Sequence, residues 1–155
     1  MIINNYNSVM NKLLLISLVV FTQINLSSAD FVVKMLNQSS TGVMVFEPAV
    51  LEIGVGDTVT FQSTDAAHNS ASIPGMIPAG ASAWNGQLSR DTTVTFDIPG
   101  IYGYQCTPHA MMAMVGVIKV GGDSSNKDSV QAAAKLYKST FVMNQTRLDD
   151  YLSKI

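Results

Sequence analysis

Short runs of alternating apolar and polar residues are the feature that most limits how this chain can fold. One such run is residues 58–62, in which Val59 and Phe61 share one face. Turn-forming residues such as Pro99-Gly100 separate the runs. About seven short strands joined by turns between residues 30 and 122 predict a mainly β fold, a sandwich of two sheets.

Two regions depart from this alternation. Residues 69–90 are long and rich in small residues, so we expect a loop that contains one short strand or a turn of helix. After Gly122 the composition changes to Ala, Lys, Gln and Leu, and helices are predicted over residues 128–138 and roughly 144–153, the second with Asn144 as its N-cap. Each predicted helix has an apolar face, formed by Val130, Ala134 and Tyr137 in the first and by Leu148, Tyr151 and Leu152 in the second. Neither helix would be stable alone, so both are expected to pack on the sandwich.

The first 29 residues are predicted to be a signal peptide rather than part of the fold. Lys12 supplies a weak positive region, residues 13–21 are apolar, and Ser27 and Ala29 place small residues where a cleavage site requires them. The apolar run is shorter than the ~20 residues of a membrane-spanning helix. An anchor that stays attached is the alternative, and Met10 is a second possible start. The chain then divides into a leader (1–29), a β body (30–122) and a helical extension of the same domain (123–155).

Composition narrows the class of protein. With 47% apolar and 13% charged residues, the chain suits one compact domain. Its formal net charge of -2 leaves no excess of basic residues for binding phosphates, which argues against a nucleic-acid partner. Exported proteins normally pair their cysteines, yet Cys106 is alone. This cysteine is therefore either a small buried hydrophobic side chain or a thiol to which another group is bound.

The residues near Cys106 in the sequence indicate that its sulfur binds a metal. The segment 106–114 has the spacing Cys-x2-His-x4-Met, which supplies a thiolate, the imidazole of His109 and the thioether of Met114 from one loop. His68, the second of only two histidines, lies just after a predicted strand. Two His, one Cys and a weak axial Met form the ligand set of a type 1 (blue) copper site, which carries single electrons. Zinc is the alternative metal, but its motifs have other spacings and rarely use Met.

Residues beside these ligands have expected supporting roles. Asn69 follows His68, and we expect it to tie the two ligand loops together by hydrogen bonding near Thr107. Pro108 has no N–H and so removes one possible hydrogen bond to the Cys106 sulfur. Fewer such bonds leave the thiolate more electron-donating, which favours Cu(II) and lowers the reduction potential.

Several segments together resemble a known family, the pseudoazurins, a branch of the bacterial cupredoxins. The segments that carry the resemblance are residues 44–48, 56–61, 68–69, 76–78, 106–109 and 112–114. Plastocyanins share the Cys-x2-His-x4-Met spacing but end at the last strand, so the two predicted helices favour a pseudoazurin. The resemblance implies a cupredoxin Greek-key β-sandwich with two C-terminal helices packed on it.

The resemblance also implies a function. Such a protein is a monomeric periplasmic electron shuttle without stable membrane association, with His109 as the exposed ligand through which electrons pass. Its partners are redox proteins, with a c-type cytochrome as donor and a nitrite reductase as acceptor. Family members dock through a ring of lysines around an apolar patch.

This chain departs from the family in its charges. Between residues 30 and 122 only three residues are basic, against seven acidic ones. Ala66 and Gln105 stand where the family often has lysine, and Ala110 replaces a frequent aromatic residue. We therefore expect docking to rely on an apolar surface around His109, formed by Met44, Pro108, Ala110 and Met112.

Enzymatic turnover is not expected. A catalytic copper centre would need further histidines, and a nucleophile–His–carboxylate set would need at least one that is not a metal ligand. A copper chaperone or storage protein that uses the nine methionines is the alternative binding function, although these methionines do not form repeated Met-x-x-Met runs.

Overall fold

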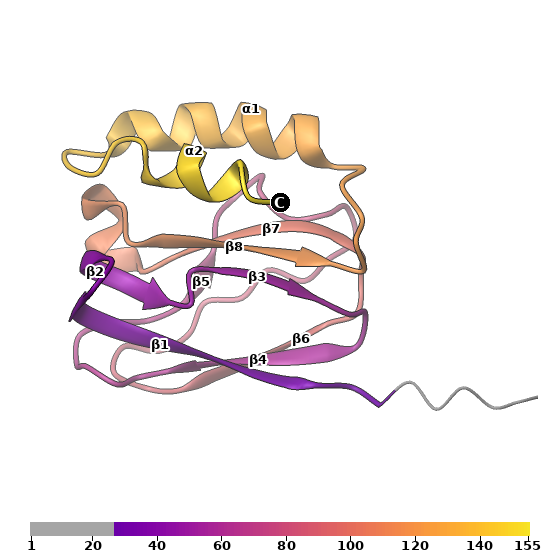
Figure 1. Ribbon diagram of the computed structural model, residues 1–155, viewed down its shortest axis with the longest axis horizontal. Coiled ribbons are helices and arrows are strands. Elements are labelled where there is room, and N and C mark those ends of the chain that lie inside the picture. The colour runs from indigo at the N-terminus through magenta and orange to yellow at the C-terminus, as the bar shows by residue number, and fades with distance from the viewer. Residues whose placement is uncertain (1–26) are drawn as a thin grey trace, which may run out of the picture.

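Two β-sheets face each other, and two helices cover the outer face of one of them (Figure 1). The computed structural model describes residues 27–155, so the signal peptide predicted for residues 1–29 lies almost entirely outside the described residues. The predicted mainly β sandwich with two C-terminal helices is confirmed. Within residues 27–155, no helix is long and apolar enough to span a bilayer.

The first sheet has the strand order β2-β1-β4-β6. Strand β1 pairs antiparallel with β2 and parallel with β4, and β4 pairs antiparallel with β6. Side chains in β4 alternate as the sequence predicts, with Val59 and Phe61 fully buried. The bounds of these strands are β1 Asp30–Ser39, β2 Gly42–Glu47, β4 Asp57–Gln62 and β6 Thr92–Phe96.

The second sheet has the order β3-β8-β7-β5. Strand β8 pairs parallel with β3 and antiparallel with β7. Nearly every residue of β7 and β8 is buried, because the other sheet covers one face of these strands and the helices cover the other. The strands are β3 Val50–Ile53, β5 Ala71–Ser72, β7 Gly100–Gln105 and β8 Val115–Val120.

The interior between the sheets contains a cluster of aromatic rings. Tyr104 lies with its ring centroid 4.8 Å from that of Phe46 and 5.0 Å from that of Phe61, and all three side chains are almost fully buried. Trp84, from the long loop, stacks on Phe61 with 6.0 Å between ring centroids. The loop predicted over residues 69–90 does contain one short strand, β5, and its tryptophan completes the core.

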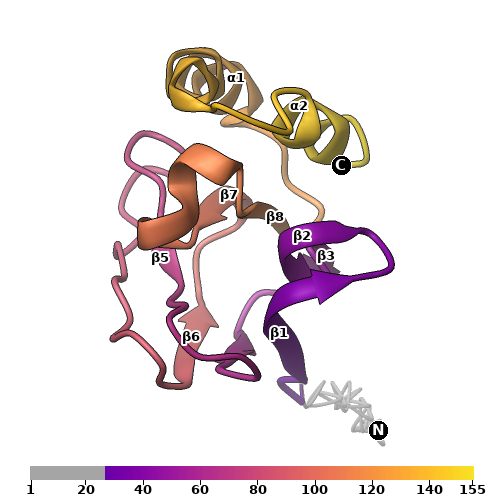
Figure 2. The same ribbon diagram turned by 90° about the vertical axis from the view of Figure 1, so that its left-hand side faces the viewer.

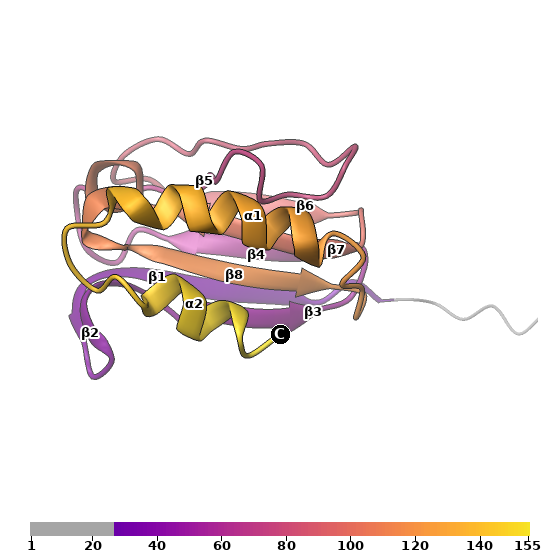
Figure 3. The ribbon, with the colours of Figure 1, turned by 90° about the horizontal axis from the view of Figure 1, so that it is seen from above.

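The helical extension packs on the outside of the second sheet (Figure 3). Helix α1 spans Lys127–Tyr137, the 3-10 helix η2 spans Lys138–Thr140, and α2 spans Arg147–Leu152. Val130 and Ala134 of α1 and Leu148 of α2 are buried against residues of β7 and β8. These apolar faces are the ones that the sequence predicts.

Two local predictions at chain turns are wrong. Asn144 is not the N-cap of α2: it has φ 51 and its carbonyl accepts a bond from the N–H of Arg147, so a turn precedes the helix and Thr146 is the N-cap. The second is at residues 37–42, whose polar residues and glycine predict a turn throughout, whereas β1 continues to Ser39 and pairs there with Gly42. The pairing leaves a tight two-residue hairpin turn.

Candidate metal centre

The loop between β7 and β8 is held in shape by its own backbone. It contains the 3-10 helix η1, Thr107–Met112, which faces the viewer in Figure 2. Proline early in η1 fixes φ at a value suited to a helical turn, and Ala113 closes the loop with φ 58 and ψ 39. The N–H of Cys106 donates to the carbonyl of Met114 at 2.9 Å, and the N–H of Met114 donates to that of His109 at 3.2 Å. These bonds bring Cys106, His109 and Met114 to one end of the sandwich.

His68 reaches the same place from the loop after β4. Its Nδ1 lies 3.6 Å from the sulfur of Cys106 and 3.1 Å from Nδ1 of His109. Nδ1 of His109 lies 3.3 Å from the same sulfur. Three soft or borderline donor atoms from two distant segments thus form a small triangle.

The triangle fits a transition-metal ion. A point equidistant from its three corners lies about 1.9 Å from each, close to the ~2.0–2.3 Å at which imidazole nitrogen and thiolate sulfur bind a first-row metal such as zinc. Two imidazole nitrogens that face each other at this distance repel unless a proton or a cation lies between them. Met114, fully buried in the same cluster as Cys106, adds a thioether. This donor set is the one that copper prefers among first-row metals.

A side chain that the sequence analysis did not single out fixes the orientation of His68. The side-chain oxygen of Asn37 lies 3.0 Å from Nε2 of His68, so Nε2 carries the proton and Nδ1 presents its lone pair to the site. The N–H of Asn37 in turn donates to the carboxylate of Asp65 at 2.7 Å. An asparagine beside a hairpin reads as a turn residue in sequence, and nothing in its local pattern indicates a contact 31 positions away.

Burial acts on the protonation of both buried donors. It lowers the pKa of His68, and neighbouring His109 lowers this pKa further. It raises the pKa of the Cys106 thiol, while backbone N–H groups of Asn69 and His109 oppose the rise. The site therefore favours the neutral imidazole that can bind a metal, whereas the thiolate needs a cation beside it.

Asn69 joins the two ligand loops. Its side-chain oxygen accepts a bond from the N–H of Thr107 at 2.8 Å, and its amide nitrogen donates to the Thr107 hydroxyl at 3.1 Å and to the carbonyl of Gly86 at 3.0 Å. Asn69 is only 4% exposed. These bonds hold the His68 segment against the start of η1.

The remaining predicted residues lie around the outer edge of the site. Thr107 and Pro108 are exposed, and His109, Ala110 and Met112 are half-buried. Met44, on β2, is also half-buried. Its carbonyl and that of Ala113 both accept hydrogen bonds from the guanidinium of Arg147. His68 is fully buried, so His109 is the histidine that reaches the surface.

Comparisons with known proteins agree with this chemistry. Residues 33–121 match the family model described as copper binding proteins, plastocyanin/azurin family. The pseudoazurin of Methylorubrum extorquens is 34% identical over 140 residues, which cover 90% of this chain and 91% of that protein. The pseudoazurin of Paracoccus pantotrophus is 35% identical over 128 residues, 83% of this chain and 85% of that protein.

The chain belongs to the pseudoazurin family. The crystal structure of a pseudoazurin from Methylobacterium extorquens AM1 superposes with a TM-score of 0.70 at 37% identity, covering 81% of this chain and 98% of that one. Native pseudoazurin from Hyphomicrobium denitrificans gives 0.72 at 32% identity, with the same coverage. This pseudoazurin is therefore a copper protein of the electron-transfer class, with His68, Cys106, His109 and Met114 arranged as a type 1 copper site.

Proposed function

We propose that this pseudoazurin is exported to the periplasm, where it shuttles single electrons between redox proteins through one type 1 copper ion held by His68, Cys106, His109 and Met114. The observation that supports it most is the convergence of two imidazole Nδ1 atoms and one thiolate within 3.6 Å of one another. Bound copper alternates between Cu(I) and Cu(II) and so supplies the one-electron chemistry. In this proposal residues 1–29 are the leader, residues 30–122 the copper-binding body and residues 123–155 its helical extension.

The surrounding residues hold the ligands in place for both oxidation states. Asn37 fixes the ring of His68, and Asn69 ties the His68 segment to the start of η1. Because these bonds do not involve the metal, they persist when an electron arrives, and little rearrangement accompanies the transfer. Pro108 adds no N–H donor near the sulfur, which keeps the thiolate electron-donating.

Electrons enter and leave through His109, the ligand at the surface. We infer that partners dock on the apolar side chains around it, Met44, Pro108, Ala110 and Met112, because the body carries three basic residues against seven acidic ones. The donor in this proposal is a c-type cytochrome and the acceptor a nitrite reductase, and the shuttle works as a monomer without turning over a substrate.

Absorption spectroscopy of the copper-loaded protein tests the proposal. The expected result is an intense thiolate-to-copper band that bleaches reversibly on reduction and is lost in Cys106→Ala. A colourless protein that releases Cu(I) readily to a chelator would instead indicate a copper chaperone or storage protein, and the electron-transfer proposal would be rejected.

A further inference from the structure

Three consecutive carbonyls of the ligand loop, those just before Met114, are held by the segment that precedes and begins α2. The carbonyl of Met111 accepts a bond from the N–H of Val142 at 2.8 Å. That of Met112 accepts from the side-chain amide of Asn144 at 3.2 Å. The carbonyl of Ala113 accepts from Nη1 of Arg147 at 3.0 Å.

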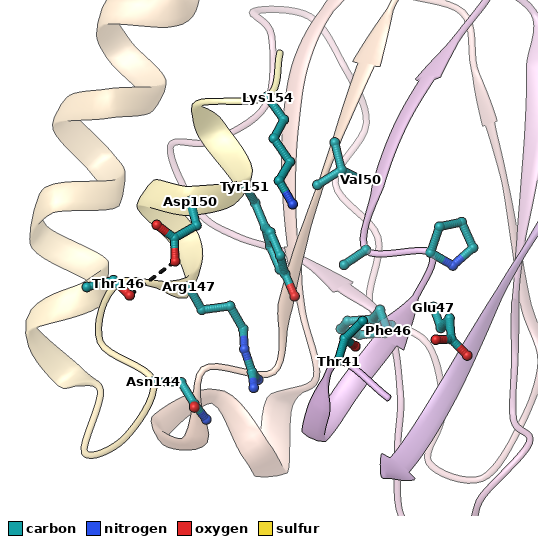
Figure 4. Close-up of a pocket in the computed structure, with 12 residues that line it drawn as sticks. Thr41, Phe46, Glu47, Val50, Asn144, Thr146, Arg147, Asp150, Tyr151 and Lys154 are labelled. Carbon is teal, nitrogen blue, oxygen red and sulfur yellow. Dashed lines mark hydrogen bonds between the residues drawn. The ribbon is translucent and has the colours of Figure 1, made fainter. Parts of the chain in front are cut away.

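Arg147 extends this attachment to the first sheet. Its Nη1 also donates to the carbonyl of Met44 at 2.9 Å, and Nη1 and Nη2 both lie 3.3 Å from the carbonyl oxygen of Val43. Figure 4 shows the side chain of Arg147 leaving α2 toward η1 and β2, with Asn144 beside the same coil. One guanidinium therefore links α2, β2 and the residue that precedes the axial methionine.

The two residues whose carbonyls Nη1 holds at 3.0 Å or less have unusual backbone angles. Met44 has φ 48 and Ala113 has φ 58, in the left-handed region that side chains disfavour. A planar guanidinium offers five N–H donors in a fixed fork and can satisfy several carbonyls at once, which a lysine ammonium does not do with the same geometry. The fork of Arg147 thus stabilises two left-handed backbone positions, one on β2 and one in the ligand loop.

A glycine of β2 lies beside this guanidinium. Gly42 has φ +135, and a Cβ on it would lie 3.1 Å from Nη2 of Arg147. The charge of Arg147 is not used in an ion pair, because the single salt bridge within residues 27–155 joins Lys138 to Asp149. The guanidinium therefore serves backbone carbonyls alone in this part of the chain.

We propose that Arg147 is a positioning residue of the copper centre, and that through it the helical extension sets the place of Met114 relative to Cys106 and His109. This inference rests on the proposed ligand set. The hydrogen bonds reach the ligands through the backbone of residues 111–113, so loss of Arg147 loosens the loop without removing a donor atom.

The test compares Arg147→Met with Lys154→Met. Lys154 is also on the C-terminal segment and lines the same pocket of about 700 Å³, but its ammonium lies near the ring of Tyr151 rather than near the ligand loop. In the copper-loaded proteins we would measure the intensity ratio of the charge-transfer bands and the rate of copper release to a chelator. In the metal-free proteins we would measure hydrogen exchange at the amides of Ala113 and Met114.

For Arg147→Met we expect a changed band ratio, copper release about 10-fold faster, as is typical when an outer-shell partner is lost, and faster exchange at both amides. Lys154→Met should behave as wild type. Identical band ratio, release and exchange in the two variants would overturn the proposal. If Arg147→Met does not fold, Arg147→Lys, which keeps charge and stem but not the fork, decides by the same measurements.

The outcome separates this inference from the proposed function. A wild-type protein without an intense charge-transfer band would reject the proposed ligand set, whatever Arg147 does. Exchange at Ala113 and Met114 in the metal-free protein would still show whether Arg147 orders the loop. Unchanged exchange together with an unchanged blue site would reject the positioning role alone.

Discussion

The side-chain oxygen of Asn37 lies 3.0 Å from Nε2 of His68, on the side of the imidazole away from the Cys106 sulfur. The bond selects the tautomer whose Nδ1 is free, and it fixes the plane of the ring before a metal arrives. The N–H of Asn37 itself donates to the carboxylate of Asp65, so the buried histidine is oriented by a short chain of hydrogen bonds that begins in the loop after β4 and passes through β1. Orientation of this kind raises the affinity of a site for its metal.

Replacing Asn37 should weaken copper binding without unfolding the protein. Asn37→Ala removes the acceptor for His68 Nε2, and we expect affinity for copper to fall about 10–100-fold, the usual effect of losing an outer-shell partner. Competition with a chelator measures the change. Gln38→Ala, the exposed neighbour on β1, is the matched control, and equal affinities in the two variants would contradict the role given to Asn37.

Asn69 should matter more for stability than its partner Thr107. Asn69→Ala removes the hydrogen bonds to the N–H of Thr107 and the carbonyl of Gly86 in a partly buried region, which should reduce the free energy of unfolding by about 0.5–1.5 kcal/mol for each lost bond. Thr107→Val removes only the hydroxyl and keeps the backbone bond, so its effect should be smaller. Denaturant unfolding of the metal-free proteins gives both values, and the reverse order would show that Asn69 is not the main tie between the loops.

The axial role proposed for Met114 has its own test. Met114→Gln replaces a weak thioether with an amide oxygen, a harder donor that favours Cu(II), so we expect a coloured protein with a lower reduction potential. Voltammetry measures the potential. Met112→Gln changes the same side chain two positions earlier and should leave the potential close to that of wild type. A similar fall in both variants would argue that polarity near the site, not ligation, lowers the potential.

Docking on an apolar surface predicts a weak salt dependence. Electrostatically steered association slows steeply as ionic strength rises from ~0.01 to ~0.15 M, whereas apolar docking barely responds. Stopped-flow measurement of electron transfer to a copper nitrite reductase over this range distinguishes the two. Met112→Lys should slow the reaction and Val32→Lys, an exposed position on β1, should not. A steep dependence in wild type would reject the apolar surface as the docking site.

Tyr137 should contribute to unfolding at alkaline pH. Burial raises its pKa to about 12, with the nearby Cys106 as a second cause, whereas an unfolded tyrosine titrates near ~10. The neutral form is favoured in the fold, so its contribution is complete below pH ~10 and is lost as pH rises to about 12. Tyr137→Phe should flatten the fall in unfolding free energy over this window. Parallel curves for wild type and variant, measured without metal, would show that Tyr137 is not responsible.

Local sequence patterns predicted the elements, whereas the long contacts that they predicted were those of the ligand segments, His68 with Cys106 and Asn69 with Thr107. Alternation around Val59 and Phe61 identified a strand with one buried face, and the spacing of Val130 and Ala134 gave the buried face of α1. The Cys-x2-His-x4-Met spacing located three donors because one short loop carries them. His68 was predicted as the fourth ligand because the chain has only two histidines.

Other residues escaped because their partners are remote. Arg147 bonds the carbonyl of Met44 103 positions away, and an exposed-looking arginine in a charged helix gives no sign of this. The residue type of Asn144 predicts a helix cap, whereas the chain there needs a left-handed turn that asparagine also tolerates. Residue type states what a side chain tolerates, and tertiary structure selects among those uses.

The parallel pairing of β3 with β8 has a consequence for how the protein acquires its metal. Val50 of β3 pairs with Val117 of β8, so the second sheet is complete only when these two distant segments of the chain have come together. Contacts between such distant segments form slowly compared with local ones. Until such long-range contacts form, the segments that carry His68 and Cys106, 38 positions apart, are not held together, so the unfolded chain offers copper no such site and bound copper stabilises the fold.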